Sequence, residues 1–129
     1  MKLRSVVLMS AVLVVAAMVQ PSFAGGGALD GKTFSGQMTP KGEKKGDADD
    51  FEFKDGKFHS TACDKYGFDS AAYTAKADGK ATHFDAVTRS GDSTITWKGE
   101  VKGDHVSGTA VMSEKGKTKD YLFAGDLKK

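Results

Sequence analysis

Residues 93–113 read STITWKGEVKGDHVSGTAVMS, two stretches of alternating apolar and polar side chains on either side of Gly103-Asp104. A two-residue glycine turn between alternating segments is the strongest short-range signal for a β-hairpin. Because a two-residue loop fixes the register, Trp97 is expected to face Ala110 across the pair of strands. This segment therefore predicts an antiparallel hairpin whose cross-strand partners can be counted from its turn.

Four further glycine turns divide the chain in the same way. They are Asp55-Gly56, Asp78-Gly79, Ser90-Gly91 and Lys115-Gly116. Counting outward from the turns predicts one row of side chains across neighbouring strands, formed by Tyr73, Phe84, Trp97, Ala110 and Tyr121. The whole pattern predicts eight strands, at about 32–38, 49–54, 57–62, 71–77, 80–88, 93–102, 105–113 and 118–127. We therefore expect an all-β, up-and-down antiparallel meander.

One face of these strands is apolar and the other is polar, which suits an antiparallel sheet that buries one side. The residues expected on the inward face are Phe34, Phe51, Phe53, Phe58, Tyr73, Phe84, Ile95, Trp97, Val101, Val106, Met112, Tyr121, Phe123 and Leu127. Gly99 and Gly108 also fall on this face, where the ring of Phe123 is expected to lie across the gap. The predicted fold is a meander of eight strands closed into a small barrel, with a two-sheet β-sandwich as the alternative.

The first residues are expected to be an export signal rather than part of the sheet. Lys2 and Arg4 precede a short apolar run at 6–19, and the small residues Ser22 and Ala24 stand at the positions expected before a cleavage site. This is the pattern of a secretory signal peptide, and its apolar run is too short for a membrane span. We therefore expect a signal peptide at 1–24, a single barrel domain at 25–129, and a periplasmic or secreted mature chain without a membrane anchor.

The charge balance carries no signal for a polyanionic partner. Without Lys2 and Arg4, the 19 basic residues fall to 17, which equals the 17 acidic residues. A neutral surface of mixed sign gives no electrostatic footprint for nucleic acid or anionic lipid. The acidic stretch 47–50 lacks the spacing of a calcium-binding loop and is expected to be solvated. The single cysteine, Cys63, excludes an intramolecular disulfide, and we expect a monomer that binds no nucleic acid.

Several short segments resemble a known architecture. They are LDGK at 29–32, CDKYGF at 63–68, WKG at 97–99 and VKGD at 101–104. Together with the strand pattern, they resemble calycin-type barrels, the lipocalin and avidin architecture, and short exported bacterial proteins of uncertain function. A fainter similarity, in the spacing of Ser90-Gly91 and WKG, is to periplasmic lysozyme inhibitors. The resemblance implies a closed barrel rather than one activity, because small barrels host many functions.

The predicted register brings no catalytic residues together. Cys63 and His59 are four residues apart on one expected strand, roughly 13 Å, which is too far for a thiol–imidazole pair unless the strand breaks. His59 is expected opposite Glu52. His59, His83 and His105 all fall on the outward face of strands that are not adjacent, so no shared metal site is predicted. We expect a non-enzymatic protein with no catalytic residue, no metal and no cofactor.

The aromatic side chains of the inward face are the main functional candidates. Five of them are predicted to line a cavity: Tyr73, Phe84, Trp97, Tyr121 and Phe123. In an eight-stranded barrel, side chains either fill the interior or leave room for one small ligand. We therefore predict a barrel that binds a small apolar or aromatic molecule inside. The alternative is a protein-binding module, such as a periplasmic hydrolase inhibitor, that uses the 63–69 loop with Tyr66 and Phe68 as exposed anchors.

Overall fold

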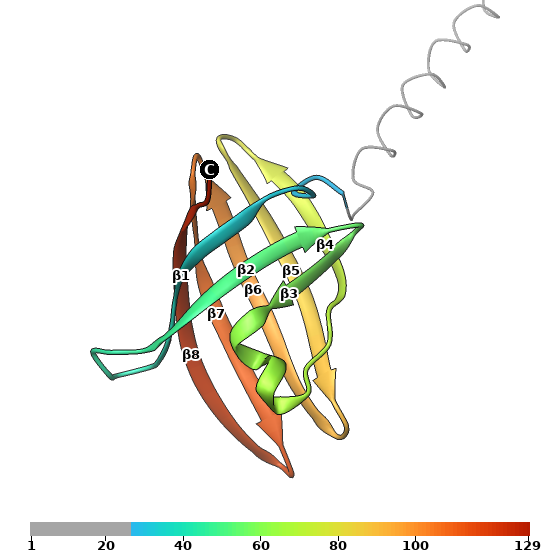
Figure 1. Ribbon diagram of the computed structural model, residues 1–129, viewed down its shortest axis with the longest axis vertical. Helices are drawn as coiled ribbons and strands as arrows, with labels where there is room; N and C mark the ends of the chain where they lie inside the picture. The colour runs from blue at the N-terminus through green and yellow to red at the C-terminus, as the bar shows by residue number, and fades with distance from the viewer. Residues whose placement is uncertain (1–26) are drawn as a thin grey trace, which may run out of the picture.

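The computed structural model describes residues 27–129 as a single closed barrel (Figure 1). Its eight strands are β1 (Thr33–Pro40), β2 (Asp47–Lys54), β3 (Lys57–Ser60), β4 (Ala71–Asp78), β5 (Ala81–Ser90), β6 (Ser93–Lys102), β7 (His105–Glu114) and β8 (Lys117–Leu127). Each strand pairs antiparallel with the next, and β8 closes the barrel against β1. The predicted barrel is confirmed, and the β-sandwich alternative is wrong. The expected signal peptide at 1–24 lies outside the described residues.

The five hairpin turns exist, but two of them begin one residue later than predicted. Asp78 pairs with Ala81, which places Gly79 first in its two-residue loop, and Gly91 is first in its loop for the same reason. Gly79 has a φ of 65° and Gly91 a φ of 60°, and the residues that follow them are not in the positive region. These are features of type II′ turns, which place glycine first. The dipeptide therefore marks each turn correctly without locating it to the residue.

This shift changes the predicted aromatic row at one position. Tyr73 pairs with Ala86, and Ala86 pairs with Trp97, so Ala86 occupies the place assigned to Phe84. The remainder of the row, from Trp97 through Ala110 to Tyr121, is confirmed. Moving a turn by one residue moves the pairing by two, so every side chain keeps its predicted face.

The barrel interior is filled by aromatic rings in contact with one another. Eight aromatic side chains are at most 2% exposed: Phe34, Phe51, Phe53, Phe58, Tyr73, Phe84, Trp97 and Phe123. Neighbouring ring centroids are 4.9 Å apart for the closest pairs, such as Phe58 and Trp97. Phe123 pairs with Gly108 and lies over Gly99, where an added Cβ would be 2.7 Å from the ring. All of the predicted inward residues are buried or half-buried, so the predicted core is confirmed.

One end of the barrel is covered by residues 27–31. The hydroxyl of Tyr73 accepts hydrogen bonds from the N–H groups of Gly27 and Leu29, at 3.0 and 2.9 Å, and donates one to Asp30 at 2.8 Å. The Asp30 carboxylate in turn accepts the N–H of Gly56 in the β2–β3 turn. The side chain of Leu29 is buried in the core. These contacts hold the chain before β1 across this end of the barrel.

The opposite end carries η1 (Thr61–Tyr66), a 3₁₀ helix that follows β3. The strand expected at 57–62 therefore ends at Ser60, earlier than predicted, and β3 forms only two residue pairs with β4. Figure 1 shows η1 beside the end of the barrel where the β5–β6 and β7–β8 turns lie. Gly67 ends the helix in the left-handed conformation, with a φ of 83°. This short helix is the main departure from the regular meander.

Candidate functional site

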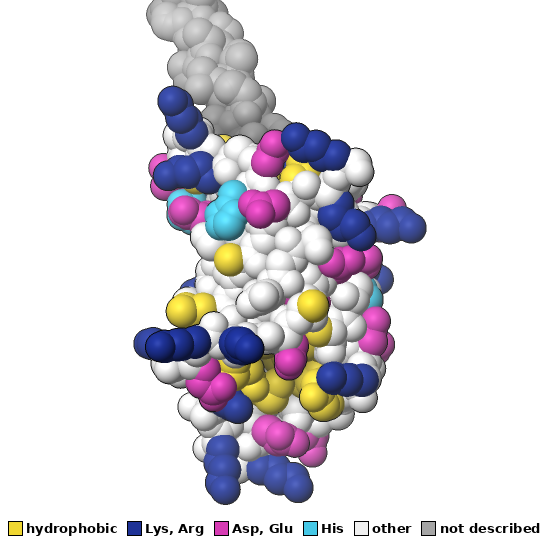
Figure 2. Space-filling model, turned by 60° about the vertical axis from the view of Figure 1, so that its left-hand side comes forward, with side chains coloured by type: hydrophobic (Ala, Val, Ile, Leu, Met, Phe, Trp, Pro, Cys, Tyr) yellow, Lys and Arg dark blue, Asp and Glu magenta, His cyan; other side chains and the backbone are white. Residues whose placement is uncertain are grey.

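A pocket of about 540 Å³ lies at the η1 end of the barrel. Its apolar lining includes Met38 of β1, Met112 of β7, Tyr121 of β8 and the two residues Cys63 and Phe68 from the η1 region. The polar residues that line it are Asp47, Lys65, Tyr66, Ser90, Ser93 and Glu114. Figure 2 shows hydrophobic side chains gathered toward this end of the molecule, between lysines and acidic side chains. The pocket is thus an apolar hollow with a charged rim.

The predicted cavity-lining residues fall into two groups. Tyr73, Phe84, Trp97 and Phe123 belong to the packed core, and none of them lines the pocket at the η1 end. The polar groups of Trp97 and Tyr73 have hydrogen-bond partners within the protein. Trp97 donates its indole N–H to Thr88 Oγ1 at 3.0 Å, and the Tyr73 hydroxyl binds residues 27–30. Tyr121 is half-buried and does line the pocket. The structure therefore places Tyr121 alone, of the five, at this pocket.

The two predicted anchors of the 63–69 loop differ in exposure. Tyr66 is 60% exposed, as predicted, and the Lys65 ammonium lies 5.3 Å from its ring centroid. Phe68 is only 5% exposed, so its predicted exposure is wrong. The chain turns inward after Gly67, and the Phe68 N–H donates to the Cys63 carbonyl at 3.3 Å. Phe68 therefore packs into the core beneath the pocket instead of presenting a free aromatic surface.

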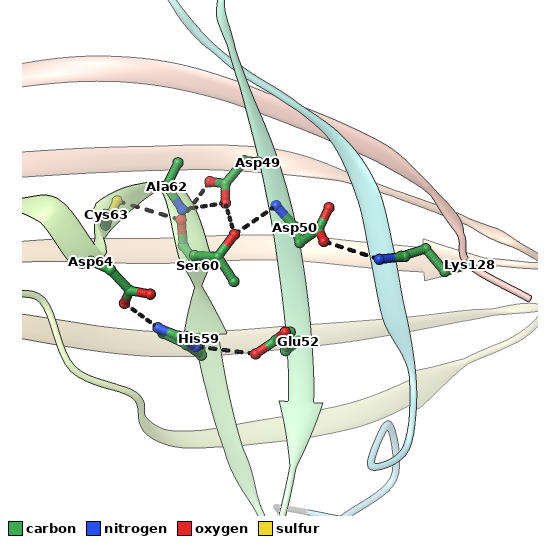
Figure 3. A network of polar contacts seen from close by, with 10 residues as sticks. Asp49, Asp50, Glu52, His59, Ser60, Ala62, Cys63, Asp64 and Lys128 are labelled. Atoms are coloured by element: carbon green, nitrogen blue, oxygen red, sulfur yellow. Dashed lines mark hydrogen bonds and ion pairs between the residues drawn. The ribbon is translucent and has the colours of Figure 1, made fainter.

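A buried carboxyl group joins η1 to the barrel. Asp49 of β2 is 4% exposed and accepts hydrogen bonds from the Ser60 hydroxyl and, at 2.9 Å, from the Ala62 N–H (Figure 3). Thr61 adds a longer contact to the same carboxylate at 3.5 Å, and its oxygen accepts the Asp50 N–H. Burial raises the pKa of Asp49, although these hydrogen bonds oppose the change. Asp49 was expected to be solvated; it instead anchors the first turn of η1.

The Cys63 thiol continues this network. Cys63 is buried and free, and its Sγ lies 3.4 Å from Ser60 Oγ. The Ser60 hydroxyl carries one proton and directs it to Asp49, so the thiol S–H is the donor to Ser60 Oγ. Burial raises the pKa of the Cys63 thiol, and the charges of Asp49 and Asp64 add to the effect. A thiol held in its protonated form is a weak nucleophile.

Strand β3 ends at Ser60, between His59 and Cys63, so the spacing of an extended strand does not apply to this pair. The two nitrogens of His59 nevertheless contact carboxylates, Nδ1 to Glu52 at 3.1 Å and Nε2 to Asp64 at 2.5 Å. The predicted pairing of His59 with Glu52 is thereby confirmed. Burial lowers the pKa of His59, but the hydrogen bonds and charges of Asp64 and Glu52 outweigh it and raise the pKa. This imidazole therefore ties η1 to β2 instead of activating the thiol.

The other two histidines pair separately with carboxylates on the outer surface. His83 contacts Asp78 at 3.1 Å and His105 contacts Asp126 at 3.0 Å. Within residues 27–129, no group of three or more His, Cys, Asp or Glu side chains is arranged to hold a metal ion. Over the same residues, no helix has both the length and the apolar character that crossing a membrane requires.

Comparison with models of known protein families, with curated proteins and with solved structures finds no match for this chain. The closed eight-stranded barrel agrees with the architecture that the sequence resembles, while membership of a calycin-type family stays a prediction. The chemistry of the η1-end pocket is thus the guide to function, because folds of this type host many activities.

Proposed function

We propose that this protein is an exported, monomeric, non-enzymatic barrel that binds one small, mainly apolar molecule in the pocket at the η1 end. The observation that supports the proposal is the pocket itself, whose volume of about 540 Å³ lies within the ~300–1,000 Å³ of small-molecule sites. Thioether and aromatic side chains line it, and a few polar groups at the rim offer orientation. The ligand would enter at this end of the barrel, with Tyr121 as a contact, rather than among the core rings.

An uncharged, environment-sensitive naphthylamine dye tests this proposal. We expect saturable fluorescence enhancement with one dye per chain. Met112→Lys places a charge in the pocket and is expected to weaken binding at least about tenfold, because burying an unpaired charge is costly. The matched control is Leu122→Lys, since Leu122 is 47% exposed on the outside of β8 and does not line this pocket. An unsaturable signal, or equal loss in the two variants, would contradict the proposal.

A panel of apolar and aromatic competitors that displace the dye would then define the ligand class. The core position of Trp97 makes its fluorescence an indirect reporter, since it contacts Phe51, Phe58 and Phe123 and not the pocket. Export is tested separately. If the signal peptide at 1–24 is cleaved, the mature chain begins at Gly25. Intact-mass measurement of the chain recovered from the periplasm or medium checks this start.

The exposed ring of Tyr66 favours a second candidate function, a protein-binding module that acts through the 63–69 loop. Tyr66 is 60% exposed beside the pocket, and aromatic residues are common anchors of protein interfaces. Tyr66→Ala is the direct test, because the change leaves the core intact. Loss of a partner captured from periplasmic extract by the wild type would support this function, and identical capture by both proteins would contradict it.

A further inference from the structure

Every sulfur-containing side chain in residues 27–129 lines the same pocket. This part of the sequence contains only Met38, Cys63 and Met112, and all three belong to the pocket at the η1 end. They come from β1, η1 and β7, elements that are far apart along the chain. Met38 and Cys63 are 7% and 5% exposed, while Met112 is half-buried. Barrel closure and the fold of η1 thus gather one thiol and two thioethers around one solvent-connected hollow.

This donor chemistry is selective for one class of ion. Thiol and thioether sulfur are soft ligands that favour Cu(I), whereas calcium and magnesium favour oxygen. Asp47 and Glu114 also line the pocket, with Lys65 beside them and the Lys119 ammonium 5.4 Å from the ring centroid of Tyr121. These four charges sum to zero, so the sulfur atoms and not the rim charge carry the selectivity. We propose that the pocket binds one soft monovalent metal ion of the Cu(I) class through Cys63, Met38 and Met112.

Binding through Cys63 releases one proton. The S–H bond breaks, a sulfur–metal bond forms with the thiolate electron pair, the proton passes to solvent, and no electrons are transferred. In the structure the Cys63 thiol lies 3.4 Å from Ser60 Oγ, and Ser60 donates to Asp49. Because a proton and the metal compete for the same sulfur, metal affinity is expected to fall as the pH falls. The two thioethers have no proton to lose, so they contribute no pH dependence of their own.

The inference uses the same pocket as the proposed function but a different property of its lining. Leucine is close to methionine in size and apolar character and lacks the sulfur. Met38→Leu and Met112→Leu therefore remove metal ligands while they keep the apolar surface for the dye. Dye binding tests the proposed function, and metal binding tests this inference, so that the failure of either one can be recognised separately.

The experiment is titration of the purified protein with Cu(I), anaerobically and against a chromophoric chelator, and with Ag(I) as a redox-inert probe. We expect one ion per chain. Loss of a residue that only supports a metal ligand costs about 10–100-fold in metal affinity. Removal of the ligands themselves, in Cys63→Ser or in the Met38→Leu/Met112→Leu double variant, is therefore expected to cost at least about tenfold. Leu122→Ala, on the outer face of β8 and outside this pocket, is expected to keep wild-type affinity.

Several results would overturn the inference. One is the absence of a one-to-one complex, and another is equal affinity for Ca²⁺ and Ag(I). A third is wild-type metal affinity in the double leucine variant. Because Cys63→Ser could disturb the Ser60 and Asp49 contacts, the leucine variants decide the question if the serine variant unfolds at lower temperature. Proton release measured in weakly buffered solution should equal one per ion in the wild type and be absent in Cys63→Ser.

Discussion

Replacing Asp49 by alanine is expected to loosen η1 from the end of the barrel. The carboxylate accepts the Ala62 N–H at 2.9 Å and the Ser60 hydroxyl within the protein interior. In Asp49→Ala the Ser60 hydroxyl can turn toward Cys63 Sγ, which lies 3.4 Å away. The Ala62 N–H has no such substitute among the contacts that it makes. One unsatisfied backbone donor at the start of η1 therefore accounts for most of the expected loss.

The size of the loss follows from two opposing effects. A buried donor without a partner costs about 1–3 kcal/mol. The variant also escapes the desolvation that raises the pKa of Asp49, which places the net loss at about 1–2 kcal/mol. For a domain of this size each kcal/mol changes the Tm by roughly 4–8 °C, so a decrease of about 4–16 °C is expected. Thermal unfolding followed by circular dichroism at pH 7 measures it.

Asp49→Asn is the matched control, because an amide oxygen can still accept the Ala62 N–H without carrying a charge. We expect its Tm at pH 7 to lie closer to that of the wild type than to that of Asp49→Ala. The folded protein holds the Asp49 proton more tightly than the unfolded chain does. The stabilisation that this bound proton provides is complete below pH 3.8 and is lost as the pH rises through the folded-state pKa of Asp49. The asparagine variant should lack this dependence. Equal destabilisation by alanine and asparagine would refute the reasoning, since charge and not the acceptor would then hold η1.

Two further substitutions test the core and the histidine contacts. Gly99→Ala is expected to destabilise by about 1–3 kcal/mol, because the new Cβ would lie 2.7 Å from the Phe123 ring. In denaturant unfolding, the double variant with Phe123→Leu should lose less stability than the sum of the losses in the two single variants. Losses that add strictly would contradict the contact. His59→Gln is expected to flatten the profile of Tm against pH above 6.5. Burial lowers the pKa of His59, but Asp64 and Glu52 raise it overall, so its stabilisation is present below 6.5 and is lost through the higher folded-state pKa; an unchanged profile would exclude this role.

The hairpin turns show how far local sequence determines register. The pairings of Trp97 with Ala110 and of Glu52 with His59 were counted correctly from their turns. The count from Asp78-Gly79 was wrong by two, because a glycine can be first or second in a two-residue loop. The same Asp-Gly pair forms the loop itself at 55–56, where both residues have positive φ. The dipeptide alone cannot distinguish these cases, and pairing with the neighbouring strands decides between them.

The candidate site was harder to predict than the core. Asp49 shares its strand face with Phe51 and Phe53, so the alternation did indicate an inward position, but an acidic stretch suggested solvent. Its burial depends on donors from residues 60–62, which become available only when β3 ends and η1 begins. The burial of Phe68 has the same origin. Loop conformation has no two-residue period to reveal it, and these positions therefore needed the folded chain.

Alternation of side chains and two-residue glycine turns are local properties, so the sequence by itself determined the meander, the number of strands and the face on which each core residue lies. Which end of the barrel is covered by residues 27–31, and which carries a pocket, was decided only by tertiary structure. Met38, Met112 and Cys63 line one pocket because β8 closes against β1 and η1 folds back beside this end of the barrel. Those contacts join residues far apart in the chain, and no local pattern specifies them.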